Sequence, residues 1–192
     1  GEIYIEGNNV LHLNPKELND VRKHLGFLFQ GAALYDSMSV RENLEFPLIR
    51  HFNFTPKERE DKVKSVLEKV SLEEAIDKMP SELSGGMKKR IGLARSIISE
   101  PKLMLYDEPT TGLDPITSKE ISSLILELQK SLNMTSVIVT HDLLCAEIIA
   151  DRAIVLNEGI VQHAGTIAEL TTSSDHFLRN FFSHEIVEDQ NR

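Results

Sequence analysis

The sequence predicts an α/β protein with a mostly parallel sheet and an inserted α-helical subdomain. Short apolar runs with strand character alternate with segments of helical periodicity, and this alternation favours a parallel sheet. The runs expected to form strands are residues 3–5, 25–29, 103–106, 137–140, 153–156 and 160–162. Only helical patterns occur from about residue 39 to residue 98, so this block is expected to form the inserted subdomain.

Helix starts are marked by a repeated local pattern. A side chain able to cap a helix is followed three residues later by Glu, which is the spacing of a capping box. The five expected starts are Asn14, Ser39, Thr55, Ser71 and Thr166. Two stripes of apolar residues at helical spacing are expected to face the core: Val63, Val66, Leu67 and Val70, and Ile121, Leu124, Ile125 and Leu128.

Three parts of the chain follow from this pattern. Residues 1–38 and 99–170 are expected to form a partial α/β core, and residues 39–98 the helical subdomain. Residues 171–192 are expected to form a C-terminal helix and a tail that frays after about Ser183. A turn at Glu158 and Gly159 predicts that the last two strands form a hairpin.

Composition narrows the class of protein. The chain has 192 residues, of which 41% are apolar and 27% charged, enough for one domain with a sizeable core. A net charge of −9 argues against a nucleic-acid partner. No run of about eighteen apolar residues occurs, so a membrane role would act through partners and the chain is expected to be cytoplasmic. The single cysteine, Cys145, is expected to be a small buried apolar residue.

An acid pair follows the strand expected at residues 103–106. The carboxyl ends of parallel strands are where open α/β sheets bind ligands. There Asp107 is suited to hold Mg²⁺ through a water molecule, and Glu108 to orient and deprotonate an attacking water. A general base of this kind contributes about 10² to 10⁴ in rate. Taken alone, the dipeptide also fits an exposed strand end before a Pro turn.

A glycine pair begins a basic helix. Ser84 is a good N-cap, and Gly85 and Gly86 leave bare amides in the first turn of a helix expected to run to about residue 98. The positive end of such a helix binds anions. The alternative is a glycine pair that merely ends a loop. Lys88 and Lys89, which follow, are interpreted as a solvated face of the helix.

Three further residues occupy turns or strand ends. Gln30 ends the strand at residues 25–29, where its amide is placed to reach a metal ion and the attacking water. Asp114 follows a tight turn and is expected to cap a helix that begins at Pro115. His141 closes the strand at residues 137–140, at the sheet edge expected to carry Asp107 and within reach of a γ-phosphate. Each also has an ordinary structural interpretation.

Together, in order and spacing, these motifs resemble the Q-loop, signature, Walker B, D-loop and switch histidine of ABC-type ATPases. The resemblance implies a P-loop NTPase-like fold, ATP and Mg²⁺ as ligands, a head-to-tail homodimer with a second ATPase subunit, and transmembrane permease partners. It implies catalytic roles for Glu108 and His141, and magnesium contacts for Gln30 and Asp107. The residues implied to contact nucleotide are Gln30, Ser84, Gly85, Gly86, Asp107 and Asp114.

A narrower resemblance concerns the substrate. Residues 27–40, 42–44 and 106–116, together with Met87 in the signature, are similar to the ATPases of Mce-associated lipid importers, including the Mla phospholipid system. This implies lipid or phospholipid transport across the cell envelope, with an Mce-type substrate-binding protein in the full system. It also implies a peripheral location at the cytoplasmic face of the inner or plasma membrane. The lipid would contact partner subunits.

The sequence departs from the family at its beginning. It contains no Gly-Lys dipeptide and therefore no Gly-x-x-x-x-Gly-Lys-Ser/Thr loop. Residues 1–3 resemble the strand that follows the P-loop helix, so the Walker A strand and helix are expected to be missing. The missing strand is expected to belong beside residues 103–106. We expect weak ATP binding by the chain alone, and a neighbouring chain covering the strand edges left open.

Two other classes share some of these features. ABC-type ATPases of DNA repair or translation carry the same motifs, but the segment between Gln30 and Ser84 is too short for a long coiled coil. A non-catalytic relative that acts as a regulatory binding module would keep the fold without needing Glu108 and His141, which are both present. The transporter ATPase is therefore the favoured interpretation.

Overall fold

The computed structural model describes residues 1–183. The chain divides into two compact units, Gly1–Val139 and Thr140–Arg192, and each is described by itself. The predicted fraying after Ser183 lies outside the described residues. The division into a core, a subdomain at residues 39–98 and a C-terminal part stays a prediction.

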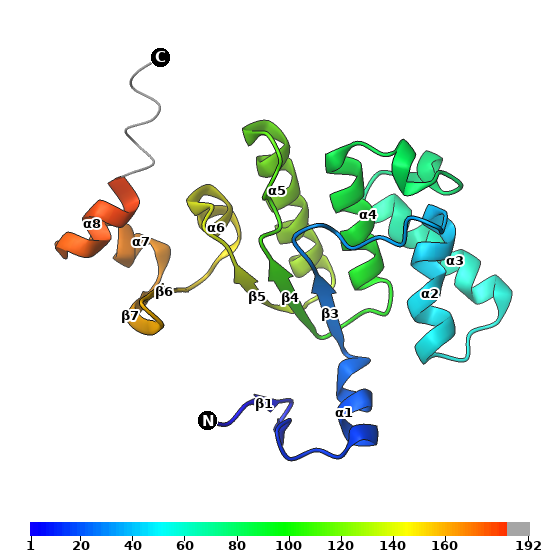
Figure 1. The fold of residues 1–192 in the computed structure, drawn as a ribbon, viewed down its shortest axis with the longest axis horizontal. Coiled ribbons are helices and arrows are strands. Elements are labelled where there is room, and N and C mark those ends of the chain that lie inside the picture. The colour runs from blue at the N-terminus through cyan, green and yellow to red at the C-terminus, as the bar shows by residue number, and fades with distance from the viewer. Residues whose placement is uncertain (184–192) are drawn as a thin grey trace. The chain divides into compact units, whose positions relative to one another are not determined.

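A three-stranded parallel sheet forms the centre of the first unit (Figure 1). It contains β3 (Leu25–Leu28), β4 (Leu103–Asp107) and β5 (Thr135–Val139), in the order β3-β4-β5. The register aligns Phe27 with Leu105 and Leu105 with Val137. The parallel α/β sheet predicted from the sequence is confirmed.

The position expected for a missing strand is wrong. β4 pairs along one edge with β3 and along the other with β5, from Leu103 to Asp107. A strand has only two edges that can form ladder hydrogen bonds, so no place beside β4 is open. Any further parallel strand would have to pair with β3 or β5.

The two faces of this sheet differ in exposure because side chains alternate along each strand. Leu28, Met104 and Tyr106 point to one face and are at most 2% exposed. On the other face, Phe27 and Val137 are 42% and 52% exposed. One face is therefore core, and the other is an apolar surface within this unit.

Tyr106 on the buried face gives a prediction about alkaline pH. Burial raises the pKa of Tyr106 to about 12, while the nearby Ser136 hydroxyl acts in the opposite direction. An unfolded tyrosine ionises near pH 10, so above pH 10 the unfolded state loses its proton first and native stability falls. Urea unfolding across this range should show a loss of about 2 to 3 kcal/mol by pH 12. Tyr106→Phe should lack this loss, and parallel curves for the two proteins would contradict it.

A short hairpin and one helix precede the sheet. β1 (Tyr4–Ile5) lies within the strand predicted at residues 3–5. It pairs antiparallel with β2 (Asn8–Asn9), a strand that the sequence did not indicate. α1 (Pro15–Arg22) follows, and Asn14 and Glu17 form the predicted capping box.

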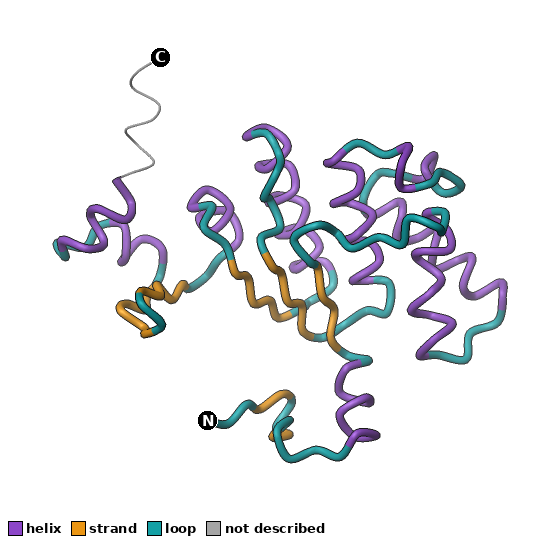
Figure 2. Tube along the Cα trace, in the orientation of Figure 1, coloured by secondary structure: helices purple, strands orange, loops and turns teal. Residues whose placement is uncertain are grey.

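Between β3 and β4 the chain is helix and loop only, as Figure 2 shows, which confirms the helical block. Its elements are α2 (Val40–His51), α3 (Pro56–Lys69), η1 (Glu73–Ala75), η2 (Pro80–Glu82) and α4 (Gly85–Ile97). Capping boxes form at Ser39 and Thr55. The first predicted stripe is buried, with 4% exposure or less: Val63, Val66, Leu67 and Val70.

The helix start predicted at Ser71 is wrong. Ser71 has a φ of 55° and closes α3, because its N–H donates to the Glu68 carbonyl and the Leu72 N–H to the Leu67 carbonyl. This pair of bonds is the Schellman arrangement that ends helices. Only the 3-10 turn η1 follows, and its N-cap, Leu72, makes no side-chain cap hydrogen bond.

Asn43 organises the loop between β3 and α2. It is fully buried, and its Nδ2 donates to the carbonyls of Tyr35, Met38 and Ser39 at 3.0 to 3.1 Å. Its Oδ1 accepts from the Tyr35 N–H at 2.8 Å and from Arg95 at 3.3 Å. One amide side chain thus closes the loop upon itself.

α5 (Pro115–Ser131) connects β4 to β5 and begins where predicted, with Asp114 as its N-cap. Its predicted stripe is buried, with Leu124 the most exposed member at 8%. Both helices with predicted apolar stripes therefore turn those stripes to the core.

The described residues of the second unit, 140–183, form a helix, a hairpin and two further helices. α6 (Leu143–Ile149) carries the buried Cys145, as expected. β6 (Ala153–Asn157) and β7 (Ile160–Gly165) pair antiparallel through the predicted turn, where Glu158 and Gly159 have φ values of 49° and 79°. α7 (Ile167–Thr171) starts with the capping box of Thr166, and α8 (His176–Ser183) ends the described chain. None of the helices in residues 1–183 has the length and apolar content that a bilayer crossing requires.

Candidate functional site

The first turn of α4 is built as the sequence predicts. The Ser84 Oγ accepts a hydrogen bond from the Met87 N–H at 3.2 Å. The preceding N–H groups, of Gly85 and Gly86, have no acceptor within the helix because they belong to its first turn. A Cβ on Gly86 would lie 3.0 Å from the Thr117 Cγ2, so the neighbouring helix leaves little room for a side chain there.

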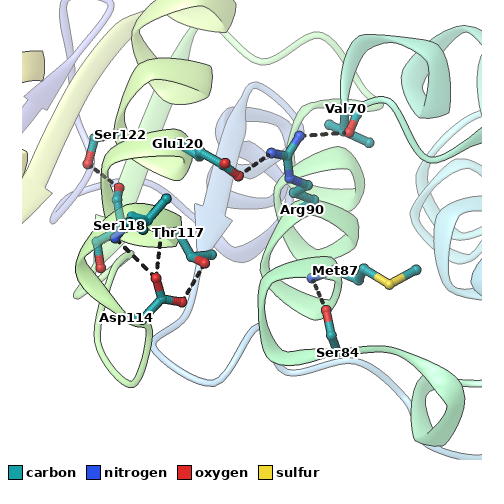
Figure 3. A network of polar contacts seen from close by, with 10 residues as sticks. Val70, Ser84, Met87, Arg90, Asp114, Thr117, Ser118, Glu120 and Ser122 are labelled. Carbon is teal, nitrogen blue, oxygen red and sulfur yellow. Dashed lines mark hydrogen bonds and ion pairs between the residues drawn. The ribbon is translucent and has the colours of Figure 1, made fainter.

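Asp114 faces this turn from the start of α5, as Figure 3 shows. Its Oδ1 accepts from the N–H groups of Ile116 and Thr117 at 3.1 and 3.0 Å, and its Oδ2 from the Thr117 hydroxyl at 2.5 Å. The Thr117 hydroxyl, followed by the backbone N–H groups, lowers the pKa of Asp114. The cap therefore carries a negative charge at neutral pH.

A cleft of about 470 Å³ lies between the two helix starts. Its lining combines bare amides, a carboxylate and one ion pair. The lining residues are Ser84, Gly85, Gly86, Met87, Arg90, Gly112, Leu113, Asp114, Thr117 and Glu120. The cleft joins the glycine pair and Asp114, which the sequence predicts as separate parts of one site.

Arg90 connects the elements that border this cleft. One guanidinium nitrogen donates to the Glu120 carboxylate at 3.1 Å and another to the Val70 carbonyl at 3.3 Å (Figure 3). The side chain therefore ties α4 to α5 and to the end of α3.

The acid pair stands at the carboxyl end of β4, as predicted. Asp107 is the last residue of the strand and is half-buried. Glu108 follows with a φ of 47°, and its N–H donates to the Val139 carbonyl at 2.9 Å. The Thr111 hydroxyl donates to the Glu108 Oε2 at 3.1 Å. The Glu108 carboxylate is thus oriented by a neighbour within its own turn.

The interpretation of Lys89 as part of a solvated helix face is wrong. Lys89 is only 5% exposed, and its Nζ donates to the carbonyls of Gln30 and Glu108, the latter at 3.2 Å. Gln30 lies just after β3 and is exposed. Lys89 therefore links the Gln30 and Glu108 segments, and sequence reasoning missed this link.

His141 belongs to the second unit and begins it together with Thr140. Next to it, Asp142 caps α6 by accepting from the Cys145 N–H at 3.0 Å. His141 therefore lies two residues after the end of β5 and directly before the N-cap of α6. Its proposed action on a γ-phosphate stays a prediction.

Oxygen ligands suited to Mg²⁺ are present, although not as a cluster. Within residues 1–183 no three His, Cys, Asp or Glu side chains come together in a metal-binding group. Magnesium usually takes one or two protein ligands and completes its shell with water and substrate phosphates. The Asp107 carboxylate and the Gln30 amide fit that requirement.

The fold and the site define the class of protein. The protein is an α/β protein with two acids at the end of a parallel strand and a glycine-led helix that faces an Asp-capped turn. Helix starts and strand ends of this kind are where α/β proteins bind phosphate-bearing ligands.

The family follows from comparison with known proteins. Residues 1–111 match the family described as ABC transporter. The chain is 40% identical over 185 residues to the intermembrane phospholipid transport ATP-binding protein MlaF of Haemophilus influenzae, covering 96% of this chain and 70% of that protein. It is 36% identical over 188 residues to the methionine import ATP-binding protein MetN of Carboxydothermus hydrogenoformans, covering 97% and 55%. The chain belongs to the ABC transporter family of ATP-binding proteins, which hydrolyse ATP to drive transport.

The fold agrees with this assignment. The dimeric ATP-binding cassette MJ0796, solved in a post-hydrolysis state with ADP and Pi, superposes with a TM-score of 0.77 at 32% identity. The match covers 87% of this chain and 73% of that one. The P-loop NTPase-like α/β fold predicted from the motifs is therefore confirmed.

Proposed function

We propose that this protein is the ATPase subunit of an ABC transporter that moves phospholipid or a related lipid across the cell envelope. The observation that carries the proposal is the cleft that Ser84, Gly86 and Asp114 line together, with Asp107 and Glu108 at the end of the central strand. The similarity to MlaF supports a lipid substrate. The subunit works at the cytoplasmic face of the inner or plasma membrane as a peripheral protein.

Each candidate residue then has a chemical role. Glu108 would orient and deprotonate the attacking water. Asp107 would hold Mg²⁺ through a water molecule, and Gln30 would contact the same ion and water. His141 would donate to the γ-phosphate. Magnesium supplies charge neutralisation on the phosphates when it is bound. Because most of phosphoryl transfer is positioning and charge stabilisation, the fixed backbone of Glu108 matters as much as its basicity.

The remaining residues serve a second subunit. Ser84, Gly85 and Gly86 would bind the nucleotide held by the partner in a head-to-tail homodimer, and Asp114 would complete that contact. The dimeric state described for MJ0796 supports this arrangement. Transmembrane permease subunits and an Mce-type substrate-binding protein complete the proposed assembly.

The substrate can be tested with the native assembly. The protein, tagged in its own organism, is purified from membranes with its permease and reconstituted into vesicles. ATP hydrolysis should rise severalfold with phospholipid substrate and remain at its basal rate with methionine. Stimulation by methionine would overturn the lipid assignment and leave the ATPase assignment standing. Absence of any ATP hydrolysis in the purified assembly would overturn both.

The 192-residue polypeptide alone is expected to bind MgATP no more tightly than at millimolar concentration. Its sequence contains no Gly-Lys phosphate loop, and each charge-assisted phosphate contact contributes about 1.5 to 3 kcal/mol. Micromolar binding requires only about 8 kcal/mol in total, so loss of several contacts removes most of it. Isothermal titration calorimetry checks this expectation, and micromolar binding to the polypeptide would contradict it.

A further inference from the structure

Lys89 is a buried cation whose partners are main-chain carbonyls. It is 5% exposed, between the partly exposed Lys88 and Arg90. Its Nζ donates to the carbonyls of Gln30 and Glu108. Burial lowers the pKa of Lys89, while the nearby carboxylates of Glu108 and Asp107 act in the opposite direction. A charge kept inside at such a cost needs satisfied donors, and the two carbonyls provide them.

The Glu108 peptide is held from several directions. Its backbone lies in the left-handed region at a φ of 47°, which is unfavourable for a residue other than glycine. The N–H is fixed by the Val139 carbonyl of β5. The carbonyl accepts from Lys89 at 3.2 Å and from the Thr111 N–H at 3.4 Å. Of these restraints, the Lys89 bond is the one that comes from the helical block.

α4 contacts the segment after Gln30 at two further positions on the same side of the helix. A Cβ on Gly92 would lie 2.8 Å from the Ala32 Cβ, so α4 and this loop are in close contact. The Arg95 guanidinium donates to the Ala32 carbonyl at 3.0 Å. Lys89, Gly92 and Arg95 follow each other at three-residue spacing, and therefore hold the loop along one side of one helix.

We propose that Lys89 is a positioning residue that couples the first turn of α4 to the backbones of Gln30 and Glu108. It lies little more than one helical turn after Ser84. A displacement of α4 when its first turn meets a phosphate is therefore passed through the ammonium group to the peptide that carries the Glu108 carboxylate. This role rests on the proposed function, and it describes how that function is regulated.

Hydrogen exchange on the 192-residue chain tests the contact without any ATP chemistry. The reporters are peptides covering residues 29–35 and 108–113, which contain the bonded amides of Ala32, Thr111 and Leu113. Lys89→Met should speed exchange at least about tenfold in both peptides and leave the other described segments unchanged. Lys89→Arg should keep protection within about threefold of the native protein. Lys69→Met makes the same chemical change at an exposed position and should alter neither peptide.

Two results would overturn the proposal: unchanged exchange in either peptide, or an equal rise throughout the chain, which would mark Lys89 as a general stabilising residue. If Lys89→Met does not fold, Lys89→Gln takes its place, because the shorter amide keeps a donor but loses the reach to both carbonyls.

The purified transporter supplies an independent kinetic readout. Lys89→Met should lower kcat for ATP at least about tenfold with KM unchanged within about twofold, and Lys89→Arg should restore kcat. An unchanged kcat, or a raised KM with kcat unchanged, would overturn the coupling role. A native transporter without ATPase activity would instead overturn the proposed function, while the exchange result would stand by itself.

Discussion

Replacing Glu108 with Gln is expected to lower ATP turnover by the assembled transporter about 10²- to 10⁴-fold. The amide keeps the size of the side chain and can still accept the hydrogen bond that the Thr111 hydroxyl donates at 3.1 Å. It cannot accept the proton of the attacking water. The loss should therefore appear in kcat, with ATP affinity nearly unchanged. Steady-state ATPase assays with a parallel nucleotide-binding measurement separate the two quantities.

Glu127→Gln is the matched control for this experiment. Glu127 is exposed on α5 and lies outside the cleft, so the same chemical change there should leave turnover within about twofold of the native value. A Glu108→Gln protein that retains more than about a tenth of the native rate would show that another group activates the water.

A methyl group at Gly26 is expected to cost about 3 kcal/mol or more of folding free energy, at the upper end of overpacking effects. The added Cβ would lie 2.1 Å from the Met104 Sδ and 2.5 Å from the Ser96 carbonyl oxygen. The methionine side chain can rotate away, but the Ser96 carbonyl belongs to the α4 backbone. Gly26→Ala therefore has to push α4 from the sheet or bend β3. Urea unfolding measures the cost.

Gly31→Ala provides the comparison for this substitution. A Cβ there would meet no atom within 4 Å, and Gly31 does not need a positive φ. The change should leave stability the same or raise it by up to about 1 kcal/mol. A loss below about 1 kcal/mol for Gly26→Ala would mean that α4 yields more easily than this close packing indicates.

Local signals in the sequence were sufficient for most elements. The capping boxes at Asn14, Ser39, Thr55 and Thr166 form as predicted because all their partners lie within one turn. Ser71 is also followed three residues later by Glu, but it lies at the end of α3 and does not begin a helix. Whether a Ser-x-x-Glu pattern begins a helix or follows one depends on the apolar residues before it, here the buried Val70 and Leu67.

Contacts between distant segments could not be predicted from the sequence. The neighbours of β4 are set by connections that span the helical block, so the sequence could not exclude a strand beside residues 103–106. Helical spacing is the one signal that indicates the burial of Lys89. Leu93, Ser96 and Ile97, which lie four, seven and eight residues later and share its helix face, are all buried. Helical periodicity therefore placed Lys89 on the inner face. Its partners, two carbonyls in distant segments, have no counterpart in sequence patterns.

The buried amide of Asn43 also limits how this part of the sequence can vary. Its hydrogen bonds to Tyr35, Met38 and Ser39 fit a loop of one length only. An inserted or deleted residue would break several of them at once, whereas the side chains of Asp36 and Ser37 in the same loop are exposed. Substitutions at the exposed positions of this loop should therefore be tolerated much better than insertions or deletions.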